Sequence, residues 1–195
     1  MLRGYLTAGH AHIPSSPPRI VRSARRRRAG LSLRELLISI GIITLLAGFI
    51  MAVVSRSRTA AQNATCLTRL HSVSGGLSQW AHDHSDRYPD PIALNQSWEQ
   101  CLYPYISSSQ NFQCPADEEL FPAVGSSYDW RDTSVATTTL AGRTVHDINR
   151  LDAVLVFESL PSWHMKGRMN AAHIDGSAQT MTQEKCLSDL QTPIR

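Results

Sequence analysis

The sequence predicts an α+β protein in which one long N-terminal helix packs on a small C-terminal antiparallel sheet. Residues 36–54 form an uncharged apolar run, and residues 67–84 repeat apolar side chains at spacings of three and four. Both patterns are typical of helices. Residues 127–182 contain short segments that are typical of strands. The 195 residues are enough for one folded domain of moderate size in addition to the apolar run.

Charge is distributed unevenly along the chain. Residues 1–30 contain seven Arg residues and no acidic residue, whereas the other 12 Lys and Arg residues are outnumbered by 16 acidic ones. The basic character therefore belongs to the N-terminal segment and does not indicate a nucleic-acid partner. Basic clusters beside an apolar run hold their end of the chain in the cytoplasm. We interpret residues 1–30 as a disordered basic leader that takes no part in the fold.

Residues 36–54 include nineteen residues without a charge. As a helix they would span about 28 Å at ~1.5 Å per residue, which matches a hydrocarbon core of ~30 Å. Arg56 and Arg58 mark the far interface. The sequence therefore predicts a transmembrane helix over residues 31–54.

The helix is expected to continue beyond the apolar run, to about His84. Leu67, Leu70, Val73, Leu77, Trp80 and His84 follow the helical spacing. Gly75-Gly76 should break or bend this helix, because each Gly weakens a helix by about 1 kcal/mol relative to Ala.

The C-terminal part predicts five strands, within a head that spans residues 55–185. The strands are expected at residues 127–130, 135–140, 153–158, 169–174 and 177–182. Asp175-Gly176 predicts a two-residue hairpin turn between the last two, because this pair accepts positive φ angles. Residues 186–195 are expected to form a loose tail.

The N-terminal segment resembles the signature of type IV prepilins and type II secretion pseudopilins. That signature consists of the Arg25–Arg28 cluster, Gly30, and then Leu31-Ser32-Leu33-Arg34-Glu35-Leu36-Leu37-Ile38. The resemblance implies that a prepilin peptidase cuts after Gly30 and methylates the new N-terminal residue, Leu31. It also implies a pilin-like fold, and a contact between Glu35 and the N-terminus of a neighbouring subunit during assembly.

Later segments resemble one pseudopilin-like subgroup that is abundant in planctomycetes and their relatives. The C-terminal motif of that subgroup is a His, a nine-residue gap and then Asp-Gly. Here ten residues separate His164 from Asp175-Gly176, and Asn170 stands where the subgroup has Asn. The resemblance covers nearly everything from residue 25 to residue 182.

Glu35 stands beside the apolar run, where an unpaired carboxylate is costly to bury. Cutting after Gly30 would create an α-amino group on Leu31, which is a suitable cation for the Glu35 of a neighbouring subunit. Alternatively, Glu35 lies at the headgroup level near Arg34. A simple signal anchor would explain the basic cluster and the apolar run, but it would not explain Gly30 together with Glu35.

Four cysteines follow the apolar run, namely Cys66, Cys101, Cys114 and Cys186. If the N-terminus stays in the cytoplasm, all four face an outer compartment in which disulfides can form. Two bridges allow three pairings, and the sequence does not choose among them. Our first guess is Cys66–Cys114, and the alternative is a set of free, buried thiols.

No cofactor and no metal are expected. The weak candidates for metal ligands are Asp83, Asp86, His164 and Asp175, and the carboxylates among them would suit Ca²⁺. A solvated helix end and an Asp-Gly turn explain these residues without a ligand. The sequence has no nucleophile motif, phosphate loop or paired-cysteine zinc spacing, so an enzyme is not expected.

Taken with the resemblance, these observations predict a structural subunit of a type II secretion-like or type IV pilus-like filament. It would cross the bacterial inner membrane once, with the N-terminus in the cytoplasm and the head in the periplasm. Its partners would be other pseudopilin subunits, the prepilin peptidase, the inner-membrane assembly platform and membrane lipid. The alternative is a membrane-anchored periplasmic binding module of unknown ligand.

Overall fold

The computed structural model describes residues 32–195, so the predicted leader (1–30) and Leu31 lie outside the described residues. The chain divides into two units, with the boundary after Leu45. We call Leu46–Arg195 the head unit. The elements are α1 (Leu33–Asp83), α2 (Pro91–Leu94), α3 (Trp98–Leu102), η1 (Ser109–Phe112), α4 (Leu120–Val124), β1 (Tyr128–Trp130), η2 (Val145–Asp147), β2 (Val154–Glu158), β3 (Arg168–His173), β4 (Ala178–Thr182) and α5 (Gln183–Gln191).

Helix α1 is one unbroken α-helix of 51 residues, so the expected interruption at Gly75-Gly76 is wrong. The two glycines have different surroundings. A Cβ atom added at Gly75 would meet nothing within 4 Å, whereas one added at Gly76 would lie 3.1 Å from Cγ1 of Ile106. Gly76 therefore lets the segment after α3 approach the helix closely, and the tertiary packing compensates for the low helix propensity.

The C-terminal half of α1 supplies one side of the main core. The buried line is Cys66, Leu70, Val73, Leu77 and Ala81, at spacings of three and four. The sequence pattern had the correct period but was centred slightly to one side, since Leu67 and Trp80 are half-buried and His84 is exposed. Tyr128, Trp130, Leu155 and Ala172 lie in the same core cluster, so α1 packs on the sheet.

The sheet has four antiparallel strands in the order β1-β2-β3-β4. The predicted α+β class is therefore confirmed, and four of the five predicted strands are present. The expected strand at residues 135–140 is wrong. The backbone N–H groups of Thr138 and Thr139 both donate to the carbonyl of Val135, which makes a turn there. The Thr138 carbonyl then accepts from Arg131 instead of from a neighbouring strand.

The β3–β4 hairpin forms at Asp175-Gly176, but not with the expected two-residue turn. His173 and Ser177 are joined by a backbone hydrogen bond of 2.8 Å, so three residues connect them. Gly176 has a φ of 84°, which a side chain would disfavour. Asp175 accepts a hydrogen bond from the backbone N–H of Ser177 at 2.8 Å. Asp-Gly therefore marks the hairpin correctly, but only Gly176 takes the positive φ.

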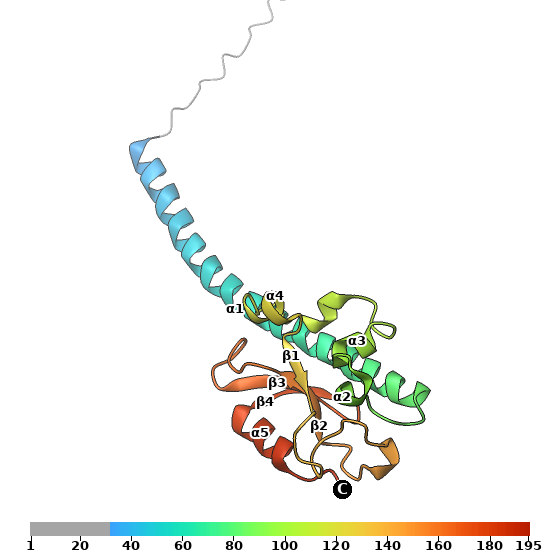
Figure 1. Cartoon of the computed structure of the whole chain (residues 1–195). Coiled ribbons are helices and arrows are strands. Elements are labelled where there is room, and N and C mark those ends of the chain that lie inside the picture. Colours follow the sequence, from blue (N-terminus) through green and yellow to red (C-terminus); the bar gives the residue numbers. More distant parts are fainter. Residues whose placement is uncertain (1–31) are drawn as a thin grey trace, which may run out of the picture. The chain divides into compact units, whose positions relative to one another are not determined.

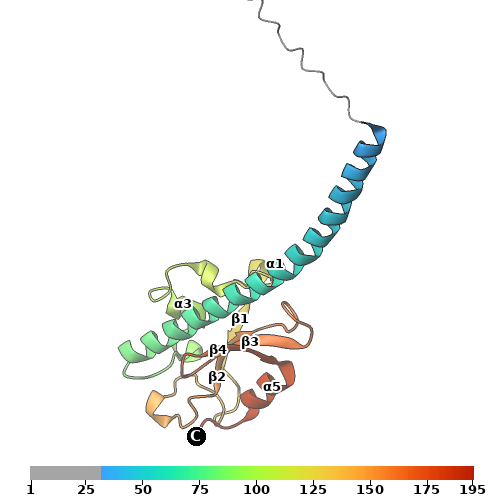
Figure 2. The ribbon, with the colours of Figure 1, turned by 180° about the vertical axis from the view of Figure 1, so that it is seen from behind.

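The other face of the sheet is covered by α5, as Figures 1 and 2 show. Val154, Met169 and Met181 form a second core cluster there with Cys186 of α5. The predicted loose tail at 186–195 is therefore wrong. Helix α5 occupies most of it, and Ile194 is fully buried in the main core. In the head unit the sheet is thus a central layer between two helices.

A buried ion pair fixes α5 to the rest of the head unit. The fully buried guanidinium of Arg131 lies 3.0 Å from Asp189 of α5. Asp189 also pairs with Arg150 at 2.6 Å and accepts from the backbone N–H of Val154 at 2.8 Å. Burial alone would raise the pKa of Asp189, but these hydrogen bonds and charges lower the pKa below the ordinary Asp value.

The two adjacent glycines of α1 should respond differently to alanine. Gly75→Ala should raise the free energy of unfolding by about 0.5–1 kcal/mol, because the site is open and Ala is the better helix former. Gly76→Ala should give no such gain, because its Cβ would press on Ile106. Urea unfolding of the full chain, followed by circular dichroism, measures both. Equal stabilisation by both variants would contradict this account.

Asp189→Asn should lower the free energy of unfolding by about 3–5 kcal/mol at neutral pH, because it leaves the buried charge of Arg131 uncompensated. Asp152→Asn is the matched control, since Asp152 also pairs with Arg150 but is exposed, and it should cost under about 1 kcal/mol.

The lowered pKa of Asp189 stabilises the fold above the ordinary Asp pKa of about 3.9, and this stabilisation is lost as the pH falls below that value. Urea unfolding between neutral and acidic pH should therefore show that the free energy of unfolding falls less steeply with decreasing pH in Asp189→Asn than in wild type. An equally steep fall in both proteins would contradict the role of Asp189.

Candidate functional site

The first turn of α1 contains a reciprocal capping arrangement. The backbone N–H of Ser32 donates to Oε2 of Glu35 at 2.9 Å, and the backbone N–H of Glu35 donates to Oγ of Ser32 at 3.3 Å. This is a capping box, in which two otherwise unpaired N–H groups are satisfied. Glu35 therefore has a role in starting the helix, which sequence reasoning missed although the Ser-x-x-Glu spacing signals it.

The cap does not use all of the Glu35 carboxylate. Both Ser32 and Glu35 are exposed, and the cap occupies one carboxylate oxygen. An ionised carboxylate has about four acceptor positions, so Glu35 can still accept from a second donor. The predicted cleavage and methylation residues, Gly30 and Leu31, lie outside the described residues.

The apolar part of α1 is exposed. Its large side chains from Leu36 to Val54 are all exposed, and no residue of the most apolar 18-residue window is buried. That window has a mean hydropathy of 2.7. Helix α1 is the one helix in the described part of the chain that is long and apolar enough to span a membrane.

A second polar site lies inside the head unit, where Cys66 of α1, Cys114, Glu158 of β2 and His164 converge. One donor atom from each of the four residues lies within 4.8 Å of the other three. Cys66, Cys114 and Glu158 are fully buried, and the exposed fraction of His164 is 9%. Within residues 32–195 this is the one group of His, Cys, Asp or Glu residues whose geometry could hold a metal ion.

Glu158 is the centre of this cluster. Its Oε1 accepts from Sγ of Cys66 at 2.9 Å and lies 3.1 Å from Nε2 of His164 and 3.8 Å from Sγ of Cys114. Sγ of Cys114 lies 3.2 Å from the same His164 nitrogen. Three side chains thus surround one carboxylate oxygen of Glu158. We call Cys66, Cys114, Glu158 and His164 the tetrad.

Neighbouring polar groups support the tetrad. The backbone N–H of Asn170 donates to Oε2 of Glu158 at 2.7 Å, and its side-chain amide donates to Oε1 at 3.2 Å. The same amide reaches Asn63 of α1 at 2.8 Å, so the network joins the helix to β3. The hydroxyl of Tyr128 lies 3.3 Å from Sγ of Cys66.

A tight turn positions Cys114. Asp117 accepts hydrogen bonds from the backbone N–H groups of Glu119, Leu120 and Phe121 and from the hydroxyl of Ser127. The oxygen of Ser127 in turn accepts from the backbone N–H of Cys114 at 2.8 Å. Burial opposes ionisation of Asp117, but these four donors lower its pKa overall. The turn at Cys-Pro-Ala-Asp therefore holds the Cys114 thiol in a fixed position.

The electrostatics of the tetrad favour a protonated Cys66 thiol and a charged His164 imidazole when no metal is bound. Hydrogen bonding to Cys114 and burial raise the pKa of Cys66 far above its ordinary value. Burial opposes the imidazolium of His164, but its contacts with Cys66 and Glu158 raise the pKa to about 9. Among the described groups, Nδ1 of His164 is buried without a hydrogen-bond partner. The carboxylate and the imidazolium thus form a buried ion pair.

The cysteines do not form the disulfides that were expected. Cys66, Cys101, Cys114 and Cys186 are all buried, free thiols. The first guess did pair the two thiols that the fold brings together, since Cys66 and Cys114 share the tetrad. In the tetrad Cys66 contacts Glu158, and Cys114 contacts both Glu158 and His164. Cys186 lies in the second core cluster, on the opposite face of the sheet.

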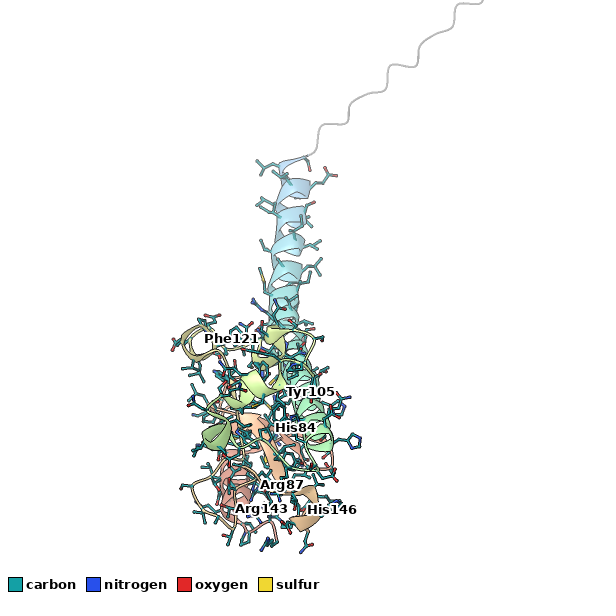
Figure 3. The ribbon with its side chains drawn as sticks, turned by 45° about the vertical axis from the view of Figure 1, so that its right-hand side comes forward. His84, Arg87, Tyr105, Phe121, Arg143 and His146 are labelled. Carbon is teal, nitrogen blue, oxygen red and sulfur yellow. The ribbon has the colours of Figure 1, made fainter. Side chains whose placement is uncertain are left out.

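The weak metal candidates do not come together. Asp83 accepts from the hydroxyl of Tyr105 at 3.0 Å, and Asp86 pairs with His146 at 3.3 Å on the surface. Figure 3 shows Tyr105 and His146 at different levels of the head unit. Asp175 caps its own hairpin. Of the four candidates, only His164 joins a cluster of His, Cys, Asp or Glu donors within residues 32–195.

Sequence reasoning missed the tetrad because its members are far apart in the chain. Glu158 ends the apolar strand β2, and an acidic residue that closes a buried strand was the available signal. Asn170 was noted only through the family resemblance, and the fold gives it a contact with Glu158.

Comparison of the chain with protein-family models, with curated proteins and with solved structures finds no match.

Proposed function

We propose that this chain is a structural subunit of a type II secretion-like or type IV pilus-like filament, which a prepilin peptidase processes after Gly30. In this proposal the apolar half of α1 holds the subunit in the inner membrane and then packs against other subunits. The basic leader stays in the cytoplasm, as expected for a positive cluster before a membrane span. The head unit lies in the periplasm. The fold is then pilin-like, and the chain catalyses nothing itself.

The observation that carries this proposal is the exposed apolar half of α1. The buried core of the head unit uses α1 only from Cys66 onward, and the large apolar side chains from Leu36 to Val54 are exposed. An uncovered apolar surface of this size requires lipid or other subunits. Gly41 and Gly48 have no atom within 4 Å of an added Cβ, and small residues allow helices to approach closely in membranes.

Glu35 supplies the specificity in this proposal. Its carboxylate lies directly before the apolar run and retains acceptor positions beyond the cap. Removal of residues 1–30 would create an amino group on Leu31. A neighbouring subunit's amino group could then pair with Glu35, which would reduce the cost of placing the carboxylate near lipid. This pairing would register one helix against the next.

Processing tests the proposal directly. Co-expression of the full chain with a prepilin peptidase should give a new N-terminus at Leu31 that carries one methyl group, as measured by intact mass and N-terminal sequencing. Gly30→Asp is the control and should remain full-length. If the wild-type chain also remains full-length beside an active peptidase, the filament proposal fails. A membrane-anchored binding module would then be the better description.

The capping box makes a sharp test of Glu35 available. Glu35→Gln removes the charge but retains an acceptor that a capping box accepts, whereas Ser32→Ala removes the cap and keeps the charge. We expect Glu35→Gln to abolish co-assembly with other subunits, measured by cross-linking in membranes. Ser32→Ala should assemble normally and lose only about 0.5–2 kcal/mol of helix stability. Loss of assembly in Ser32→Ala alone would assign Glu35 to the cap and not to a neighbouring subunit.

A further inference from the structure

We propose that Cys66, Cys114, Glu158 and His164 bind one Zn²⁺ ion in the head unit. The inference does not depend on the proposed filament function. It rests on the convergence of four donor atoms from four separate parts of the chain, all within 4.8 Å of one another.

The spacing of the donors fits a tetrahedral zinc site. Zinc lies about 2.3 Å from sulfur and about 2.0–2.2 Å from nitrogen or oxygen, so neighbouring ligands in a tetrahedron lie about 3.3–3.8 Å apart. The Cys114–Glu158 and Cys114–His164 donor distances are 3.8 and 3.2 Å. Those from Glu158 to His164 and Cys66 are 3.1 and 2.9 Å. Since all four donor atoms lie within 4.8 Å of one another, every donor–donor distance is within about 1.5 Å of its tetrahedral value.

The donor types favour zinc over the other common ions. Two sulfur atoms, one imidazole nitrogen and one carboxylate oxygen are a zinc-type set. Ca²⁺ and Mg²⁺ prefer six or more oxygen ligands, which this site does not provide. The nitrogen that His164 would offer to the ion is Nε2, which lies beside Glu158 and Cys114.

The charges around the site are compatible with a bound dication. Two thiolates, one carboxylate and a neutral imidazole leave a net charge of about −1 around Zn²⁺ once both thiols and the imidazolium have released their protons to solvent. The backbone N–H of Asn170 donates to Glu158 and stabilises this negative charge, and the polar Tyr128 hydroxyl lies beside Cys66. Such outer contacts orient the ligands of a metal and tune its binding.

A surface cavity borders one ligand of the site. A surface cavity of about 410 Å³ is lined by His164 and Met165 together with Asn63 and Thr59 of α1. The cavity therefore reaches a ligand of the site from solvent. Once bound, zinc would tie α1 to β2 and to the Cys114 turn, at the position where the exposed half of the helix gives way to the buried half.

The test uses the full chain purified in detergent under reducing conditions. After treatment with a chelator and removal of the chelator, the protein should take up one Zn²⁺ per chain, measured by elemental analysis. Co²⁺ in place of zinc should give the visible bands of a tetrahedral thiolate site. Zinc should also raise the Tm, because an ion that binds only the folded state stabilises it.

Matched cysteine variants locate the site. Cys66→Ser and Cys114→Ser should each lower the zinc affinity by more than the about 10- to 100-fold that loss of an outer contact typically costs. Cys101→Ser is the control, because Cys101 is equally buried but stands outside the tetrad. It should bind like wild type. Circular dichroism checks that each variant is folded, and His164→Gln provides an independent loss of one ligand that leaves every thiol in place.

Three results would overturn the proposal. The first is a wild-type chain that takes up no zinc while all four thiols react in denaturant. The second is a native chain, isolated without reductant, in which only two of the four thiols react. If Cys66→Ser then makes the thiol of Cys114 reactive, Cys66 and Cys114 are joined by a disulfide in the wild-type chain. The third is equal loss of zinc in Cys101→Ser and Cys66→Ser, which would indicate non-specific thiol binding. None of these results bears on cleavage after Gly30.

Discussion

The head unit depends on the burial of one carboxylate. Glu158 is fully buried at the end of β2, and an uncompensated carboxylate there would be very costly. It is compensated by Cys66 of α1, by His164 and by the main chain of β3 at Asn170. Each partner comes from a different part of the fold. The position of α1 on the sheet is therefore specified by polar contacts as well as by apolar packing, which has little directional preference by itself.

A periplasmic location and four free thiols make conflicting demands. The proposed compartment favours disulfides, yet the structure has every cysteine as a free, buried thiol. Cys101 and Cys186 are buried and stand outside the tetrad. Cys66 and Cys114 do have a partner within reach, so they are the pair at risk of oxidation. Zinc would resolve the conflict, because a thiolate that is bound to the ion is less available to an oxidant.

The sequence predicted the parts of the fold that depend on local patterns. Apolar period and run length located α1, and the Asp175-Gly176 pair located the hairpin between β3 and β4. The errors have tertiary causes. The Gly75-Gly76 break is absent because Ile106 packs against Gly76, and the expected strand at 135–140 is a turn because Arg131 takes the Thr138 carbonyl. The tail is ordered because Asp189 meets a buried Arg131, a pairing that no local pattern announces. The tetrad was missed for the same reason, since its four members come from four segments.

Helix α1 combines two features that place different demands on one element. Its first turn starts at a capping box whose acceptor, Glu35, is also the residue proposed to contact a neighbouring subunit. Its last turns are fixed in the core of the head unit by Leu70, Val73 and Leu77. Within the head unit the helix runs without a break through Gly75-Gly76, so Asn63, Cys66 and the buried line from Leu70 to Ala81 belong to one element. The network around Glu158 joins this element to β2 and β3, and a metal ion at that position would strengthen the connection.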